Sequence, residues 1–181
     1  MSSPSPKTAP YGSWRSPITS DLIVAQSIAL SEVRLDGNDI YWLEGRPQEQ
    51  GRNVVVRGTD DGRATDVTPP PYNARTRVHE YGGGSWMVAD GAVYFSNFAD
   101  GRLYRLARGA SEPQPLTPVP PAPGRDWRFA DGVIDHRRNR WIGVREDHTV
   151  AGEPVNTIVA VDLSQAGGEP GRILVSGHDF F

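Results

Sequence analysis

The chain has 181 residues, and its 18 arginines, one lysine and 22 acidic residues give a formal net charge of −3. This balance excludes recognition of nucleic acid or of an anionic membrane surface by bulk charge, so we expect neither partner. No stretch approaches the ~20 consecutive apolar residues of a membrane helix, and residues 1–20 lack the apolar segment of a secretory signal. The absence of cysteine excludes disulfides and thiolate metal sites, so the cytoplasm is the expected compartment.

Glycine and proline are abundant, with 20 and 16 residues respectively. Together they exceed the roughly 12% that is usual in proteins, which is compatible either with disorder or with many short strands joined by turns. The five Trp, six Tyr and five Phe residues favour the second interpretation, because disordered chains are poor in aromatic residues.

The first 31 residues are expected to form a lead-in to the folded part. Residues 1–13 are polar and rich in proline. Residues 18–31 show partial helical spacing behind a possible cap at Thr19 or Ser20, which predicts one short helix. After residue 31 the apolar period changes to two, which is typical of strands.

A four-strand pattern then recurs three times, over about residues 32–68, 85–117 and 127–176. The second strands of the three units begin at Ile40, Val93 and Arg140, which are 53 and 47 residues apart. A four-stranded unit that repeats about every 50 residues predicts a β-propeller blade. A single β-sandwich or barrel with turns every 8–12 residues is the alternative.

We therefore predict an all-β fold in which residues 32–181 form a partial β-propeller of about three four-stranded antiparallel blades. Closed propellers have about four to eight blades, so we expect the chain to be truncated before any catalytic domain. The open blade edges predict self-association.

Five segments carry a resemblance to a known family: YGSWRSPIT (11–19), IYWLEGRP (40–47), RTRVHEYGGG (75–84), VYFSN (93–97) and RWIGVREDH (140–148). Together they resemble the N-terminal propeller of bacterial serine peptidases of the prolyl oligopeptidase family, in the dipeptidyl aminopeptidase and acylaminoacyl-peptidase branch.

The resemblance implies a protein in which the propeller is followed by a C-terminal α/β-hydrolase domain with a Ser-Asp-His triad. The propeller would admit short peptides and, in some members, supply acidic residues that hold the substrate amine. No Gly-x-Ser-x-Gly nucleophile elbow is present, since the nearest match, around Ser85, ends in Met87. We therefore assign no catalytic residue and expect this chain alone to be inactive, with the hydrolase domain as its partner.

Four residues are candidates for binding the amino terminus of a short peptide substrate: His79, Glu80, Glu146 and Asp147. The first pair precedes three glycines at 82–84, and the acidic pair follows a predicted strand. A carboxylate can hold an ammonium group through charge-assisted hydrogen bonds. The structural alternatives are a tight crossover between blades for the first segment and a solvated loop for the second.

In an antiparallel blade, the crossover into the first strand and the loop between the second and third strands emerge at the same end. That end is expected to gather the four candidates together with other polar residues: Glu44, Arg46, Asn97, Asp100 and His148.

The histidines show no metal-binding spacing, so we expect no metal and no cofactor. Two rival functions remain open at this point. One is a stand-alone binding or scaffold propeller without a peptidase link. The other is a propeller like that of the sugar-lactone hydrolases, which needs inward Glu, Asn and Asp ligands that the sequence does not place.

Overall fold

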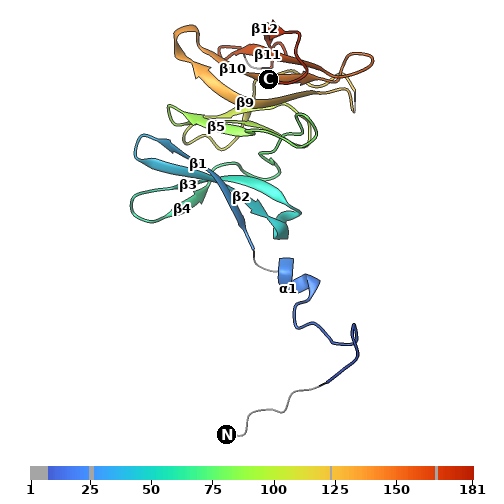
Figure 1. Ribbon diagram of the computed structural model, residues 1–181. Helices are drawn as coiled ribbons and strands as arrows, with labels where there is room; N and C mark the ends of the chain where they lie inside the picture. The colour runs from blue at the N-terminus through green and yellow to red at the C-terminus, as the bar shows by residue number, and fades with distance from the viewer. Residues whose placement is uncertain (1–7, 25–26, 123, 166) are drawn as a thin grey trace.

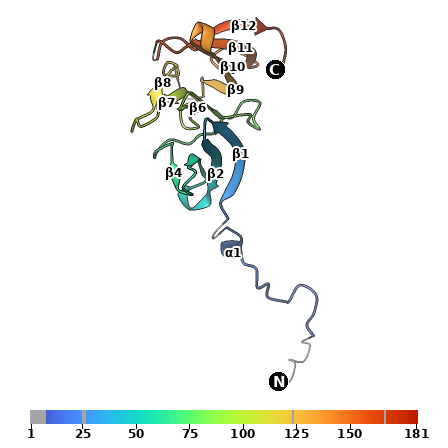
Figure 2. The ribbon, with the colours of Figure 1, turned by 90° about the vertical axis from the view of Figure 1, so that its left-hand side faces the viewer.

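The structure, a computed structural model, describes residues 8–24, 27–122, 124–165 and 167–181. It consists mainly of three four-stranded antiparallel sheets. The sheets lie on one another in chain order, and the lead-in runs away from the first sheet (Figure 1). The view turned by 90° shows the same stacking from the side (Figure 2). The predicted all-β, partial-propeller fold is confirmed.

In every sheet, each strand pairs with the strand that follows it in the chain. The first sheet contains β1 (Ala29–Asp36), β2 (Asp39–Arg46), β3 (Arg52–Gly58) and β4 (Ala64–Asp66), with the 3-10 turn η1 (Pro47–Glu49) after β2. The second contains β5 (Trp86–Ala89), β6 (Ala92–Ser96), β7 (Leu103–Leu106) and β8 (Gln114–Pro115). The third contains β9 (Trp127–Asp135), β10 (Arg140–Asp147), β11 (Val155–Asp162) and β12 (Arg172–Ser176), with the 3-10 turn η2 (His136–Arg138) after β9.

The lead-in helix is shorter than predicted. Helix α1 covers only Ser20–Val24, and the side chain of Thr19 caps it by accepting a 3.1 Å hydrogen bond from the backbone N–H of Leu22. Residues 25–26 of the predicted helix lie outside the described residues. From Ala29 onward the chain forms β1, because pairing with β2 outweighs the partial helical spacing. Within the described ranges, no helix is long and apolar enough to span a membrane.

Two apolar layers hold the three sheets together. Strand β6 is buried along its whole length because it lies between them. Its residues Val93 and Phe95 pack in a cluster with Tyr41 of the first sheet, whereas Tyr94 packs in a second cluster with Trp141 of the third. Full burial of each such side chain contributes about 1.5–3 kcal/mol, so these layers fix the stacking order.

The segment that links the first and second sheets reaches across to the third. Val78 in this segment is buried in a cluster with Ala130, Val144 and Ile158 of the third sheet. A Cβ atom at Gly83 would lie 2.7 Å from a carboxylate oxygen of Asp131 and 3.1 Å from Cβ of Ala130, so the segment runs close to the third sheet here. The linking segment thereby carries the residues after Val78 onto the end of β10.

Candidate functional site

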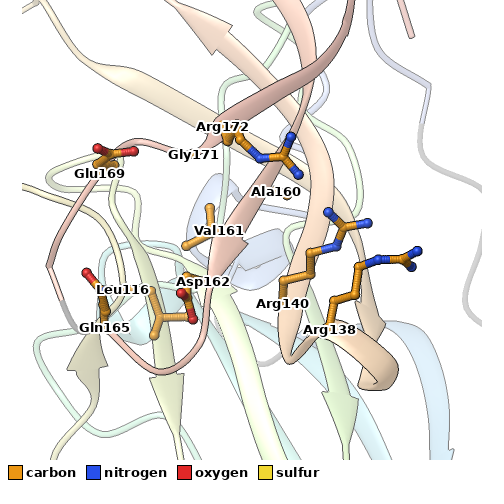
Figure 3. Close-up of a pocket in the computed structure, with 10 residues that line it drawn as sticks. All are labelled: Leu116, Arg138, Arg140, Ala160, Val161, Asp162, Gln165, Glu169, Gly171 and Arg172. Carbon is orange, nitrogen blue, oxygen red and sulfur yellow. The ribbon is translucent and has the colours of Figure 1, made fainter.

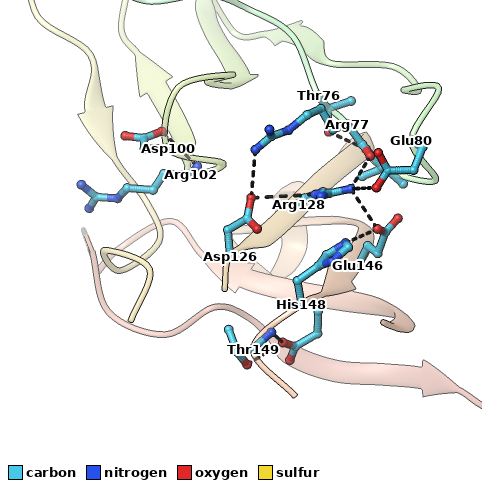
Figure 4. Close-up of polar contacts among 12 residues, drawn as sticks. Thr76, Arg77, Glu80, Asp100, Arg102, Asp126, Arg128, Glu146, His148 and Thr149 are labelled. Carbon is cyan, nitrogen blue, oxygen red and sulfur yellow. Dashed lines mark hydrogen bonds and ion pairs between the residues drawn. The ribbon is translucent and has the colours of Figure 1, made fainter. Parts of the chain in front are cut away.

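The carboxylate of Glu146 lies at the centre of a polar cluster on the third sheet (Figure 4). Only 3% of the residue is exposed. Its Oε2 accepts a hydrogen bond from the backbone N–H of His79, and the ring Nδ1 of His79 lies 3.5 Å away. Its Oε1 contacts Nε2 of His148 and lies 3.3 Å from Nη1 of Arg128. The buried charge is therefore compensated from three sides.

Arg128 joins this buried carboxylate to an exposed one. Its Nη1 donates hydrogen bonds to Oε1 of Glu80 at 2.6 Å and to the carbonyl of Arg77 at 2.9 Å. The Glu80 side chain is 76% exposed, whereas that of Arg128 is only 12% exposed. The hydrogen bond from Arg128 lowers the pKa of Glu80 below its ordinary value, and Glu80 is therefore ionised at neutral pH.

A third carboxylate completes the cluster. Oδ2 of Asp126 lies 3.3 Å from Nη2 of Arg77 and 3.8 Å from Nε of Arg128. Two guanidinium groups thus face the three carboxylates of Glu80, Asp126 and Glu146. Of these three carboxylates, that of Glu80 is by far the most exposed. Such an arrangement can attract a cation.

The backbone at the exposed edge of the cluster is in an uncommon conformation. His79 and Glu80 have φ angles of 54° and 66°, in the left-handed region that non-glycine residues seldom adopt. Hydrogen bonds from the backbone N–H of Glu80 to Arg77 and from Gly82 to Val78, both 2.9 Å long, hold the turn. Such strain persists where the surrounding contacts fix it, and it is found often at functional sites.

Three of the four predicted site residues come together: His79, Glu80 and Glu146. The fourth, Asp147, does not join them. Its Oδ1 accepts hydrogen bonds from the backbone N–H and the hydroxyl of Thr149, at 2.9 and 2.6 Å. The separation is a property of strand geometry, because successive side chains of β10 point to opposite faces. The two acidic side chains of the predicted pair therefore have different neighbours.

Of the other polar residues expected at this end, His148 contacts Glu146, whereas the remaining four form separate clusters. Arg46 binds Glu44 at 2.7 Å and Asp66 at 2.6 Å on the first sheet. Asn97 donates a 3.0 Å hydrogen bond to Asp100 in the loop after β6. These contacts stabilise their own blades and do not reach Glu146.

Sequence reasoning missed Arg128, which connects the whole cluster. In the third sheet Arg128 of β9 lies directly opposite Glu146 of β10. Opposite charges at facing positions of an antiparallel pair attract each other. The signal was therefore present in the sequence, but reading it requires the register of the two strands.

One ligand atom each from Glu80, Glu146 and His148 can be found within 4.8 Å of one another, a spacing that a metal ion could use. The Nη1 atom of Arg128 already lies within 3.3 Å of both carboxylates. The guanidinium thus supplies the cation for these two groups, and we assign no metal here.

Aromatic side chains border the cluster. The ring of His79 lies 4.6 Å from that of Phe180 and 5.9 Å from that of Tyr81, measured between centroids. The Tyr81 and Phe180 residues are 79% and 62% exposed. Glu80 lies between His79 and Tyr81 in the chain, so its exposed carboxylate is next to a partly apolar surface.

Solved structures with the same fold include proteins that hydrolyse puromycin. A puromycin-hydrolysing peptidase of Mycobacterium tuberculosis is 37% identical over 96% of this chain, with a TM-score of 0.82. A puromycin hydrolase is 33% identical over 93% of this chain, and a mutant of puromycin hydrolase complexed with PGG is 34% identical over 93%, both with TM-scores of 0.78. The chain spans only 27–28% of the length of these proteins. No protein-family model and no curated protein matches the sequence.

Three stacked four-stranded sheets define the chain as part of a β-propeller. The similarity to these peptidases confirms the more specific resemblance drawn from the five sequence segments. The chain is similar to the N-terminal propeller region of peptidases of the prolyl oligopeptidase family.

Proposed function

We propose that this chain controls access to the active site of a peptidase and helps to recognise the amino terminus of short peptide substrates. In this proposal a C-terminal α/β-hydrolase domain supplies the serine nucleophile. The similarity to puromycin-hydrolysing peptidases supports the link to hydrolysis. The exposed and ionised carboxylate of Glu80 supports a role in recognition.

The observation that carries the proposal is the contrast between the two glutamates. Glu80 is exposed and ionised, and it stands on a turn fixed by hydrogen bonds. Glu146 is buried, and its two oxygens already contact three neighbouring residues. Glu80 is therefore the group that contacts the substrate ammonium, and Glu146 acts through Arg128 and the backbone of His79 to position it.

A substrate ammonium would approach Glu80 from solvent, opposite Arg128. It would form charge-assisted hydrogen bonds with the carboxylate, which are shorter and stronger than neutral ones. An N-acylated peptide carries no positive charge at this point and gains nothing from Glu80. The proposal thus predicts a preference for free amino termini. Asp147 has no part in it, because its carboxylate is committed to Thr149.

Titration of the isotope-labelled chain with trialanine amide, followed by amide NMR, tests recognition directly. The free-amine peptide is expected to shift the resonances of Glu80 and Arg128, and the N-acetylated peptide is expected to leave them unchanged. The Glu80→Gln variant should lose the response. Glu49→Gln is the matched control, because Glu49 binds arginines of the first sheet. Equal responses to the two peptides, or none to either, would contradict the proposal.

A further inference from the structure

A second polar site lies at the other end of β10, away from Glu146. It is a cavity of about 440 Å³ whose lining includes Arg138, Arg140 and Arg172, together with Ala160 and Val161 (Figure 3). Arg140 begins β10 and Glu146 lies six residues later, about 20 Å away at the rise of a strand. The two sites are therefore separate, and the proposed recognition of an amine does not involve the cavity.

The register of the third sheet brings two of the arginines to one face. Arg140 lies opposite Asp162, and Arg172 lies opposite Ala160, two residues earlier in β11. Positions two apart on a strand share a face, so both side chains project from the same side of the sheet. Figure 3 shows Arg138, Arg140 and Arg172 extending to one side of the cavity, with Glu169 and Gln165 on the other.

These arginines are incompletely neutralised. A single oxygen of Asp135 binds Nε of Arg140 at 2.9 Å and Nη1 of Arg138 at 3.2 Å. The carboxylate of Asp162 accepts hydrogen bonds from the backbone and the hydroxyl of Ser164, at 2.8 and 2.7 Å. Within the described part of the chain, the guanidinium of Arg172 has no ion pair and no hydrogen bond.

We propose that this cavity binds an oxyanion, carried by a small phosphate or carboxylate compound. Planar guanidinium groups match the oxygen pairs of both anions. Leu116, Ala160 and Val161 contribute apolar surface for an organic portion. The volume lies within the range of small-molecule sites. Arg172 is the principal anion ligand, because its charge has no partner among the described residues, and Arg140 is the second.

Calorimetric titration of the chain with inorganic phosphate and with acetate, at constant ionic strength against chloride, tests this proposal. Saturable binding of phosphate or acetate is expected, and the stronger of the two identifies the class of anion. Arg172→Gln should weaken binding about tenfold, the loss of one charge-assisted contact. Arg137→Gln is the matched control, because Arg137 is a neighbouring arginine that does not line the cavity.

Circular dichroism of the variants establishes that they fold. Arg172 is exposed and pairs with no residue in the described ranges, so its replacement should not disturb the sheet. Saturable binding that only Arg172→Gln weakens supports the site. Absence of saturable binding for both anions would overturn it, as would equal weakening by Arg137→Gln, which would indicate general attraction to positive charge.

Discussion

At Glu146, a carboxylate taken almost completely out of water is matched by donors from two separate parts of the chain. The backbone N–H of His79 comes from the segment between the first two sheets, and Arg128 and His148 come from the third. Desolvation of a charge is costly unless such partners are in place. The cluster therefore fixes the position of the linking segment as well as the charge of the site.

Replacing Arg128 with leucine should expose this dependence. The variant keeps the bulk of the side chain but leaves Glu146 without its cationic partner from β9, at a cost of about 1–3 kcal/mol in the free energy of unfolding. Urea unfolding measures the change. Glu80→Gln removes the exposed partner of the same arginine and should leave the unfolding midpoint nearly unchanged. Equal midpoints for Arg128→Leu and the wild type would show that Glu146 does not need the ion pair.

The Arg46–Asp66 pair predicts a pH dependence. Both oxygens of Asp66 accept 2.6 Å hydrogen bonds from Arg46, and these lower the pKa of Asp66 in the folded state. The pair therefore stabilises the fold above the unfolded pKa of about 4, and its contribution disappears as the pH falls through the lower folded value. Because Asp66 is partly exposed, the contribution is below about 1 kcal/mol.

The difference in unfolding free energy between the wild type and Asp66→Asn should shrink between pH 6 and pH 3. Asp60→Asn, in the exposed turn before β4, is the control and should show no such trend. A difference between wild type and Asp66→Asn that stays constant over this range would contradict the assigned role of the pair.

At the scale of the elements, close packing around Trp141 decides the shape of the third sheet. The indole is 2% exposed, and a Cβ atom at Gly132 or Gly143 would overlap with it. Gly143→Ala is therefore expected to displace the ring and destabilise the fold by about 1–3 kcal/mol. Gly45→Ala in β2 is the control, because its added Cβ would lie 3.5 Å from its nearest neighbours and fit. Tryptophan fluorescence during urea unfolding measures the stability of both variants. Equal stabilities of Gly143→Ala and Gly45→Ala would contradict the prediction, because they would show that the sheet can adjust around Trp141.

The strands were predictable because apolar alternation and turn residues are local signals, as in β10 and β12. The helix was overextended because β1 begins at Ala29, and its pairing with β2 is a tertiary effect. The site was only partly predictable. Residue type and position singled out Glu80 and Glu146. The roles of Arg128 and Asp147 depend on the register of β9 and β10 and on the face to which each side chain points, and neither can be read from the sequence alone.

At the scale of the whole molecule, the first sheet packs on the second through one face only. On β1, Leu30, Val33 and Leu35 are 69%, 70% and 72% exposed. Contiguous exposed apolar side chains favour association, so the purified chain should sediment as a concentration-dependent oligomer. Replacing Val33 and Leu35 with lysine should reduce association. Val119→Lys, at an equally exposed residue outside the strands, should not. A compact monomer at tens of micromolar would contradict this prediction.

We propose that this chain recognises the substrate and that a hydrolase domain cleaves the bond. The most direct test is the catalytic efficiency, kcat/KM, of a peptidase that carries this chain as its propeller, with wild-type Glu80 and with Glu80→Gln. Loss of the charge-assisted contact should decrease kcat/KM about ten- to hundred-fold for a peptide with a free amino terminus. The N-acylated form of the same peptide should be affected little. Equal decreases for both peptides, or no decrease for either, would contradict the account.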